Sequence, residues 1–239
     1  MQPIVCIPGL LCTGAVFDGF ASALPNGTAA QVVELPDSDD FAALAAQIAR
    51  QLPDECVLVG MSMGSYLALA VQQLRPQAVA GMVLIGATAR ADTPEAAENR
   101  FKTVKWARKV GMPALAASLA DFLLGAESRD IVALRNQITD MAVATGGDVS
   151  ARHQTALATR PDQSAALPGI SCPVLVITGS EDRVTPPASG EELALCVQNG
   201  RHVVLQGAGH LPLLEAPRQV ASLVTRFLAE LPRNESLPA

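Results

Sequence analysis

Aromatic side chains are scarce in this sequence, at 3% of the 239 residues, with one Trp, one Tyr and six Phe. Aliphatic residues must therefore build most of the core, and any pocket should be lined mainly by aliphatic side chains and methionine. Charged residues are also few, at 17%, and the formal net charge is −6. An acidic chain without a basic excess favours no nucleic-acid partner.

Long apolar runs are missing as well. No stretch approaches the roughly 20 apolar residues that a bilayer-spanning helix requires, so no membrane association is expected. The N-terminal segment MQPIVCIPGLLCTG is apolar, but it lacks basic residues and a Pro-Gly pair interrupts it early. It is therefore interpreted as a strand and a turn rather than a signal peptide.

Cysteine and histidine patterns typical of disulfide frameworks or metal sites are absent. The chain has an odd number of cysteines without paired spacing: Cys6, Cys12, Cys56, Cys172 and Cys196. Free thiols in a reducing compartment fit this pattern better than disulfides, which predicts a cytoplasmic protein. No Cys/His cluster has metal-ligand spacing, so we expect neither a metal nor a cofactor.

The sequence does contain alternating strand and helix patterns. Strand patterns cover residues 3–8, 30–35, 55–59, 79–85, 173–178 and 201–205, and helix patterns cover 41–52, 62–74, 191–197 and 216–231. Such alternation predicts a doubly wound α/β fold with a mostly parallel sheet and right-handed crossovers. A frayed tail is expected over residues 232–239.

The alternation breaks after the fourth predicted strand. From about residue 87 to 169 there is no convincing strand pattern, and helices are expected near 94–110, 113–124, 128–144 and 149–159. The sequence therefore predicts a helical insertion of about 80 residues in an otherwise α/β domain.

The segment VLVGMSMGSYL places a Gly-x-Ser-x-Gly motif between a strand and a helix. Ser62 could simply cap the helix. However, a nucleophile elbow needs a strained serine and glycines that let neighbouring backbone pass closely, and Gly60 and Gly64 occupy those positions. The context therefore favours Ser62 as a nucleophile.

A serine nucleophile needs a base, and the chain has only three histidines. His202 lies within a strand pattern, where a structural role is expected, and His153 lies in the helical insertion. His210 follows a strand in the glycine-containing loop QGAGH, at the sheet edge where doubly wound folds place their chemistry. We therefore predict His210 as the base.

The orienting acid should also follow a strand. Asp182 does so in the segment TGSEDR, and the chain order Ser62, Asp182, His210 suits this architecture. A simple turn role for Asp182 is the alternative. Glu181 is the next candidate, ahead of Asp148 and Asp162, which both fall in the insertion.

Acyl transfer further requires donors for a developing oxyanion. One should be the backbone N–H of Met63, which follows the nucleophile. The other should come from the loop after the first strand, where Pro8 cannot donate. Leu10 is the predicted donor, with Leu11 as the second choice and as a residue that would also touch substrate.

Four segments together resemble the α/β-hydrolase fold superfamily: IPGLL, GMSMGSYLAL, CPVLVITGSEDRVTPP and GAGHLPLLEAP. The resemblance covers nearly the whole chain and implies Ser62, Asp182 and His210 as a catalytic triad. It implies a sheet of about six strands in the order 2-1-3-4-5-6. It also implies a core of residues 1–86 and 170–239 with a helical cap over 87–169.

The sequence departs from the family pattern in two places near the site. Many relatives have His-Gly where this chain has Pro8-Gly9, and many have a second glycine after the elbow where this chain has Ser65. The first departure concerns the oxyanion loop.

The expected cap contains charges with two interpretations. Arg90 and Arg160 could bind a substrate carboxylate, or they could form surface and hinge ion pairs. A basic run follows on the first expected cap helix: Lys102, Lys105, Arg108 and Lys109. Such a run is usually a solvated face, although an acidic partner such as an acyl carrier protein could bind it.

These observations predict a serine hydrolase that cleaves a small to medium carboxylic ester or lactone through an acyl-enzyme on Ser62. On the same fold, the alternatives are a thioesterase, a C–C hydrolase, a perhydrolase, an acyltransferase or a binding protein without catalytic activity.

Overall fold

A computed structural model of the protein describes residues 2–232, and its centre is a six-stranded parallel sheet. The strands are β1 (Ile4–Ile7), β2 (Ala30–Val32), β3 (Cys56–Met61), β4 (Val79–Ile85), β5 (Val174–Gly179) and β6 (Gly200–Leu205). Their order is β2-β1-β3-β4-β5-β6, and every neighbouring pair is parallel. The predicted fold class and strand order are confirmed.

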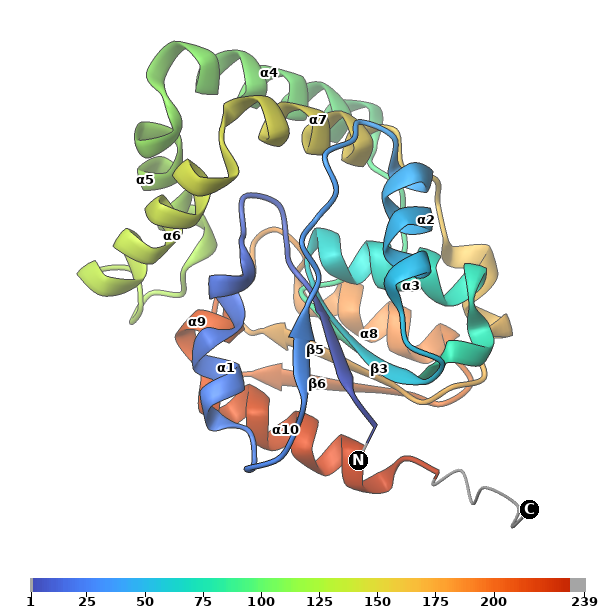
Figure 1. The fold of residues 1–239 in the computed structure, drawn as a ribbon. Helices are drawn as coiled ribbons and strands as arrows, with labels where there is room; N and C mark the ends of the chain where they lie inside the picture. Colours follow the sequence, from blue (N-terminus) through green and yellow to red (C-terminus); the bar gives the residue numbers. More distant parts are fainter. Residues whose placement is uncertain (1, 233–239) are drawn as a thin grey trace.

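Helices cover both faces of the sheet (Figure 1). One face carries α2 (Phe41–Gln51), α3 (Met63–Leu74) and α8 (Pro187–Cys196), and the other carries α1 (Asp18–Ala23), α9 (Pro212–Glu215) and α10 (Pro217–Glu230). Short 3-10 turns lie at Gly14–Phe17, Pro76–Ala78 and Ser164–Gly169. The central strands β1, β3 and β5 are buried along their whole length, as expected for a sheet covered on both sides.

Four further helices lie between β4 and β5 in the chain: α4 (Pro94–Val110), α5 (Met112–Leu123), α6 (Val132–Thr145) and α7 (Gly147–Ala158). Figure 1 shows them gathered at one end of the molecule, beyond the sheet. They pack as two pairs, α5 against α6 and α4 against α7. This matches the predicted helical insertion in position and content.

The structure corrects several boundaries. The second strand is shorter than the predicted 30–35, because it is an edge strand with exposed side chains and Pro36 follows closely. Helix α1 was not predicted; it is a six-residue helix that buries Phe20 despite the presence of Gly19. The predicted tail lies almost wholly outside the described residues.

Within residues 2–232, no helix is both long enough and apolar enough to cross a bilayer.

Candidate active site

Ser62 lies on a strained turn between β3 and α3. Its backbone angles are φ 51° and ψ −114°, a region that non-glycine residues rarely occupy. A Cβ on Gly60 would lie 2.5 Å from the Gly64 carbonyl oxygen, and a Cβ on Gly64 would lie 1.9 Å from that of Ile7. Both glycines are therefore required by close backbone approach, as the motif predicts.

Ser65, one of the two departures from the family pattern, fills a structural position behind this turn. Its buried hydroxyl lies 2.8 Å from the Gly60 carbonyl oxygen and 3.0 Å from that of Ile85. The hydroxyl also accepts a hydrogen bond of 3.0 Å from the Ile85 N–H. Ser65 therefore ties the turn to the end of β4, which glycine could not do.

The structure brings Ser62, His210 and Asp182 together from three loops. His210 Nε2 lies 2.9 Å from Ser62 Oγ, and His210 Nδ1 lies 2.8 Å from Asp182 Oδ2. Both His210 and Asp182 are buried. Each of the three loops follows a strand, and parallel strands end at the same edge of a sheet. The three residues, distant in sequence, therefore lie side by side.

Asp182 is held in one orientation by four hydrogen bonds. Oδ1 accepts from the N–H groups of Val184 and Thr185 at 2.8 and 2.9 Å, while Oδ2 faces His210 and accepts from the Thr185 hydroxyl at 2.9 Å. Burial acts to raise the pKa of this carboxyl, but the interactions with His210 and the two backbone donors outweigh it and lower the pKa. Asp182 is therefore a carboxylate at neutral pH.

Glu215 organises the His210 loop, a role that sequence reasoning missed. Its carboxylate accepts hydrogen bonds from the N–H groups of Gly209, Leu211 and Gly125 at 2.9, 3.2 and 2.8 Å. It thus joins the His210 loop to the segment after α5. Glu215 lies in the segment GAGHLPLLEAP, which carries part of the family resemblance, but the sequence of this segment does not indicate the partners of the carboxylate.

The loop after β1 passes directly beside the elbow. A Cβ on Gly9 would lie 3.4 Å from the Ser62 Cβ and 3.1 Å from the Met61 carbonyl oxygen. Leu11 has φ 61°, a left-handed conformation that is uncommon for a side chain of this size. Leu10 and Leu11 both line the cavity next to Ser62, where the sequence predicts them.

A cavity of about 580 Å³ opens beside Ser62, between the sheet edge and helices α4–α7. Most of its lining residues are aliphatic or methionine, as the composition predicts, and they include Leu10, Leu11, Leu119, Leu123, Ile138 and Leu157. Cys12 also lines it, but burial raises the pKa of this thiol to about 12, so it is not a rival nucleophile.

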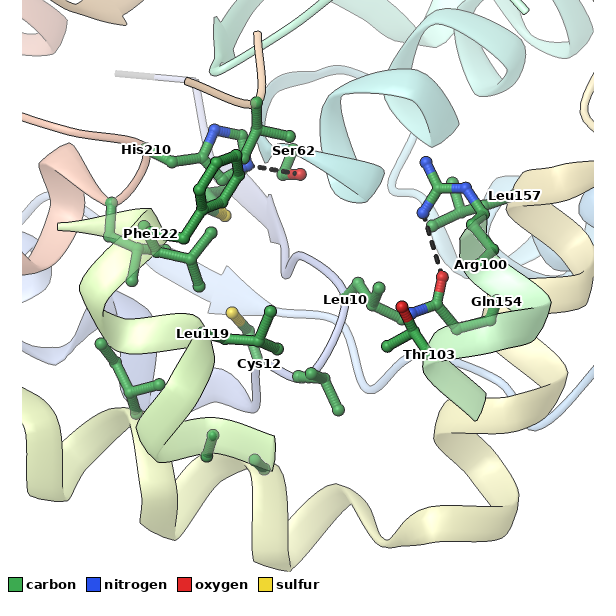
Figure 2. Close-up of a pocket in the computed structure, with 18 of the residues that line it drawn as sticks. Leu10, Cys12, Ser62, Arg100, Thr103, Leu119, Phe122, Gln154, Leu157 and His210 are labelled. Carbon is green, nitrogen blue, oxygen red and sulfur yellow. Dashed lines mark hydrogen bonds between the residues drawn. The ribbon is translucent and has the colours of Figure 1, made fainter. Parts of the chain in front are cut away.

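The two ends of the cavity differ in chemistry. In Figure 2, Ser62 and His210 lie on one side, while Arg100, Gln154 and Thr103 lie together on the other. Sequence reasoning did not select Arg100. In the sequence, Arg100 is one of several charged residues of a predicted helix, and nothing local distinguishes it. The packing of α4 against α7 places its side chain at the cavity.

Arg90 and Arg160, the predicted substrate-binding arginines, do not line this cavity. Arg90 is exposed and forms an ion pair with Glu192. Arg160 is buried, pairs with Asp92 and stacks over the Tyr66 ring at 4.6 Å. Both therefore occupy the alternative role that the sequence left open, in ion pairs beside the hinge of the helical insertion.

The other histidines take structural positions. His202 Nε2 lies 3.1 Å from the Thr178 hydroxyl, and His153 is buried with Nε2 2.8 Å from the Pro36 carbonyl oxygen. Glu181, the alternative acid, accepts a hydrogen bond from the Ala126 N–H instead.

Two further predictions concern ligands and partners. Within residues 2–232, no group of three or more His, Cys, Asp and Glu side chains is placed to hold a metal ion. The basic run is exposed on α4, where Lys102 pairs with Glu98 at 2.9 Å. Binding of an acyl carrier protein to this run stays a prediction.

Comparisons with known proteins agree with this architecture. The sequence profile described as "Alpha/beta hydrolase family" matches residues 4–223. A pimeloyl-[acyl-carrier protein] methyl ester esterase of Xanthomonas oryzae pv. oryzae is 29% identical, with 96% of each chain covered.

Solved structures give the same result. A thermophilic esterase from Thermogutta terrifontis, solved with malate bound, superposes with a TM-score of 0.87 at 27% identity, covering 96% of this chain and 90% of the esterase. The enol-lactonase of Burkholderia xenovorans LB400 superposes with a TM-score of 0.84 at 24% identity, covering 96% and 92% of the two chains. The chain belongs to the alpha/beta hydrolase family, and it is a hydrolase.

Proposed function

We propose that the protein is a serine hydrolase of small to medium carboxylic esters or lactones, with Ser62, His210 and Asp182 as its catalytic triad. The observation that carries this proposal is the continuous contact from Ser62 Oγ to His210 Nε2 and from His210 Nδ1 to Asp182 Oδ2, at 2.9 and 2.8 Å. These are the distances at which a base can take the serine proton while an acid orients the ring.

The reaction begins with attack of Ser62 Oγ on the substrate carbonyl carbon as His210 Nε2 accepts the hydroxyl proton. Asp182 stabilises the resulting imidazolium, and its four hydrogen bonds keep the carboxylate in place. His210 then returns the proton to the leaving alcohol oxygen, which leaves an acyl-enzyme ester on Ser62. Water, deprotonated by His210, cleaves that ester and restores the serine.

The developing oxyanion would be held by the backbone N–H groups of Met63 and Leu10. Met63 is the first residue of α3, so its N–H has no acceptor within the helix and lies at the positive end of the helix dipole. The Pro8-Gly9 turn carries Leu10 alongside Ser62. The left-handed backbone of Leu11 supports this assignment, because strain of that kind is often retained where a loop positions a functional group.

Helices α4–α7 would act as a cap over this site. Their side chains supply much of the cavity wall, whereas the triad comes from loops of the sheet. We therefore propose residues 1–86 and 170–239 as the catalytic core and 87–169 as the cap that selects the substrate. The similar Xanthomonas esterase and Burkholderia enol-lactonase bear names that fit ester and lactone substrates.

Covalent labelling tests this proposal directly. A fluorophosphonate probe should label the wild-type protein at Ser62, and the label should disappear in Ser62→Ala. Ser222→Ala provides a control at an exposed serine of α10, away from the cavity, and it should label as wild type does. A wild-type protein that neither labels nor hydrolyses a panel of p-nitrophenyl esters, lactones and thioesters would refute the proposal.

A further inference from the structure

The charged residues of the cavity are all of one sign. Arg100 and Arg183 line it, together with the His210 ring, and no Asp or Glu is among the described residues that do so. This is unexpected in a protein whose formal net charge is −6. A cavity lined by guanidinium groups and aliphatic walls is suited to an anion with an apolar body.

Arg100 belongs to a buried cluster with an excess positive charge. Asp92 accepts hydrogen bonds from both Arg100 and Arg160, so one carboxylate is shared between two guanidinium groups. The pKa of Asp92 is lowered, because the two arginines outweigh the effect of burial, and its charge is fully present at neutral pH. The three side chains together carry a net charge of +1.

The guanidinium of Arg100 is held in place by hydrogen bonds, but not all of its N–H groups have an acceptor. Nε and Nη2 donate to Asp92, and Nη1 donates to Gln154 Oε1 at 3.1 Å. A guanidinium has five N–H groups, so hydrogens on Nη1 and Nη2 remain for another acceptor. The side chain retains 22% of its exposure, and Arg100 lines the cavity.

Neutral donors surround this end of the cavity. Because Gln154 Oε1 accepts from Arg100, the Gln154 amide directs its Nε2 hydrogens elsewhere, and Figure 2 shows that nitrogen pointing toward Leu10 and the cavity. Asn99 and Thr103 also line this end, where the Thr103 hydroxyl donates to the Asn99 carbonyl oxygen at 2.9 Å. Apolar side chains also line the cavity, and the view shows Leu10 and Leu119 below the space that separates Ser62 from these groups.

We propose that Arg100, with Gln154 as a second donor, binds a free carboxylate at the far end of the substrate's acyl chain. The substrate class would then be half-esters of dicarboxylic acids: the ester carbonyl lies at Ser62, an aliphatic chain crosses the apolar middle, and the carboxylate meets Arg100. This inference rests on the proposed function for the identity of the reacting end. A charge-assisted contact to a guanidinium is among the stronger recognition contacts available in a protein.

Arg183 is the competing cation and has a different environment. It is exposed, stacks over the Phe122 ring at 4.8 Å and donates to the Asp121 carbonyl oxygen. It follows Asp182 directly in the chain, so it lies near the triad end of the cavity. A carboxylate bound there would require a shorter acyl chain than one bound at Arg100.

Matched substrates test the proposal. Methyl half-esters of straight-chain dicarboxylic acids are compared with methyl esters of monocarboxylic acids of equal chain length, and the ratio of their kcat/KM values is measured over a series of lengths. Wild-type protein should favour the half-ester by at least about tenfold at its best length, equivalent to ~1.4 kcal/mol. Arg100→Gln should bring the ratio close to one, and Arg100→Lys should give an intermediate value.

Two arginine variants serve as controls. Arg108→Gln makes the same change on an exposed position of α4 that does not line the cavity, and it should leave the ratio unchanged. Arg183→Gln tests whether the Arg183 guanidinium, and not that of Arg100, causes the preference for the half-ester. A ratio near one for wild type at every length, or a ratio lost in Arg183→Gln but kept in Arg100→Gln, would overturn the inference.

A binding experiment separates this inference from the proposed function. Calorimetry with Ser62→Ala should detect the methyl half-ester, and Ser62→Ala/Arg100→Gln should lose at least about tenfold in affinity. Equal affinity in the two variants refutes the carboxylate site. Absence of Ser62 labelling and of all ester hydrolysis in wild type, with the binding difference still present, refutes only the hydrolase mechanism. Because Asp92 keeps Arg160 as its partner, Arg100→Gln should fold, and its thermal midpoint verifies this.

Discussion

Asp182→Asn is the most informative change, because the structure determines how the new amide must sit. Two backbone N–H groups, of Val184 and Thr185, both donate to Oδ1. An asparagine that placed its NH2 group there would face two donors and leave both without an acceptor. An unsatisfied buried donor costs about 1–3 kcal/mol, and the Thr185 N–H is buried whereas the Val184 N–H is only partly so, so this orientation is disfavoured by at least about 1 kcal/mol, or roughly fivefold.

The favoured orientation keeps the asparagine oxygen at Oδ1 and turns its NH2 group toward His210. The Thr185 hydroxyl can then accept instead of donate, so the loop stays satisfied. His210 Nδ1 must also accept, which moves the ring proton to Nε2, toward Ser62. A protonated Nε2 cannot take the serine proton, and we expect kcat to fall by about 10³- to 10⁴-fold, or ~4–5.5 kcal/mol.

The assay is hydrolysis of a p-nitrophenyl ester at neutral pH, with the thermal midpoint and the fluorophosphonate labelling rate measured on the same samples. Stability should change little, while labelling should slow in parallel with kcat. Glu181→Gln makes the same carboxylate-to-amide change at the neighbouring residue, which bonds to Ala126 and not to His210. An Asp182→Asn protein with activity within tenfold of wild type would refute the assigned role of Asp182.

Three further changes test the surroundings of the site. Glu215→Gln places an NH2 group against at least one backbone N–H of the His210 loop, so kcat should fall by about tenfold and the thermal midpoint by a few degrees, with little change in KM. Ser65→Ala leaves the buried Ile85 N–H without an acceptor, so the free energy of unfolding measured by urea titration should fall by about 1–3 kcal/mol. The control Ser222→Ala, on an exposed face of α10, should change that free energy by no more than about 0.5 kcal/mol. Burial lowers the pKa of His153, and its buried Nδ1 has no hydrogen-bond partner among the described residues, so the imidazole binds a proton more readily in the unfolded chain than in the folded one. Stability should therefore decline as pH falls below about 6.5, and His153→Gln should reduce that decline in thermal melts. A Glu215→Gln enzyme with wild-type kcat, an unaltered urea midpoint in Ser65→Ala, or a pH profile unaffected by His153→Gln would each contradict the corresponding assignment.

The core of the fold could be predicted because its signals are local. Each buried strand is a short apolar run bounded by turn residues, and the longer helices α2 and α10 show the 3.6-residue period. The strand order followed from the resemblance to the α/β-hydrolase fold. The glycines around Ser62 carry the same kind of information, since close backbone approach excludes any side chain at Gly60 and Gly64. Helix α1 was missed because its six residues are too few for a periodic pattern.

The sequence by itself therefore determined the parallel sheet and the helical insertion. It also determined that Ser62, Asp182 and His210 meet at the edge of the sheet. Those residues follow strands, and parallel strands end together, so their proximity is a consequence of topology. The tertiary structure alone decided which of Arg90, Arg100 and Arg160 lines the cavity. Arg90, Arg100 and Arg160 are chemically equivalent in sequence, but the packing of α4 against α7 and the position of Asp92 bury one, expose another and leave Arg100 at the end of the cavity. Side-chain packing between helices distant in sequence has no local signature. For that reason, the end of the cavity that holds Arg100 could be identified only from the structure.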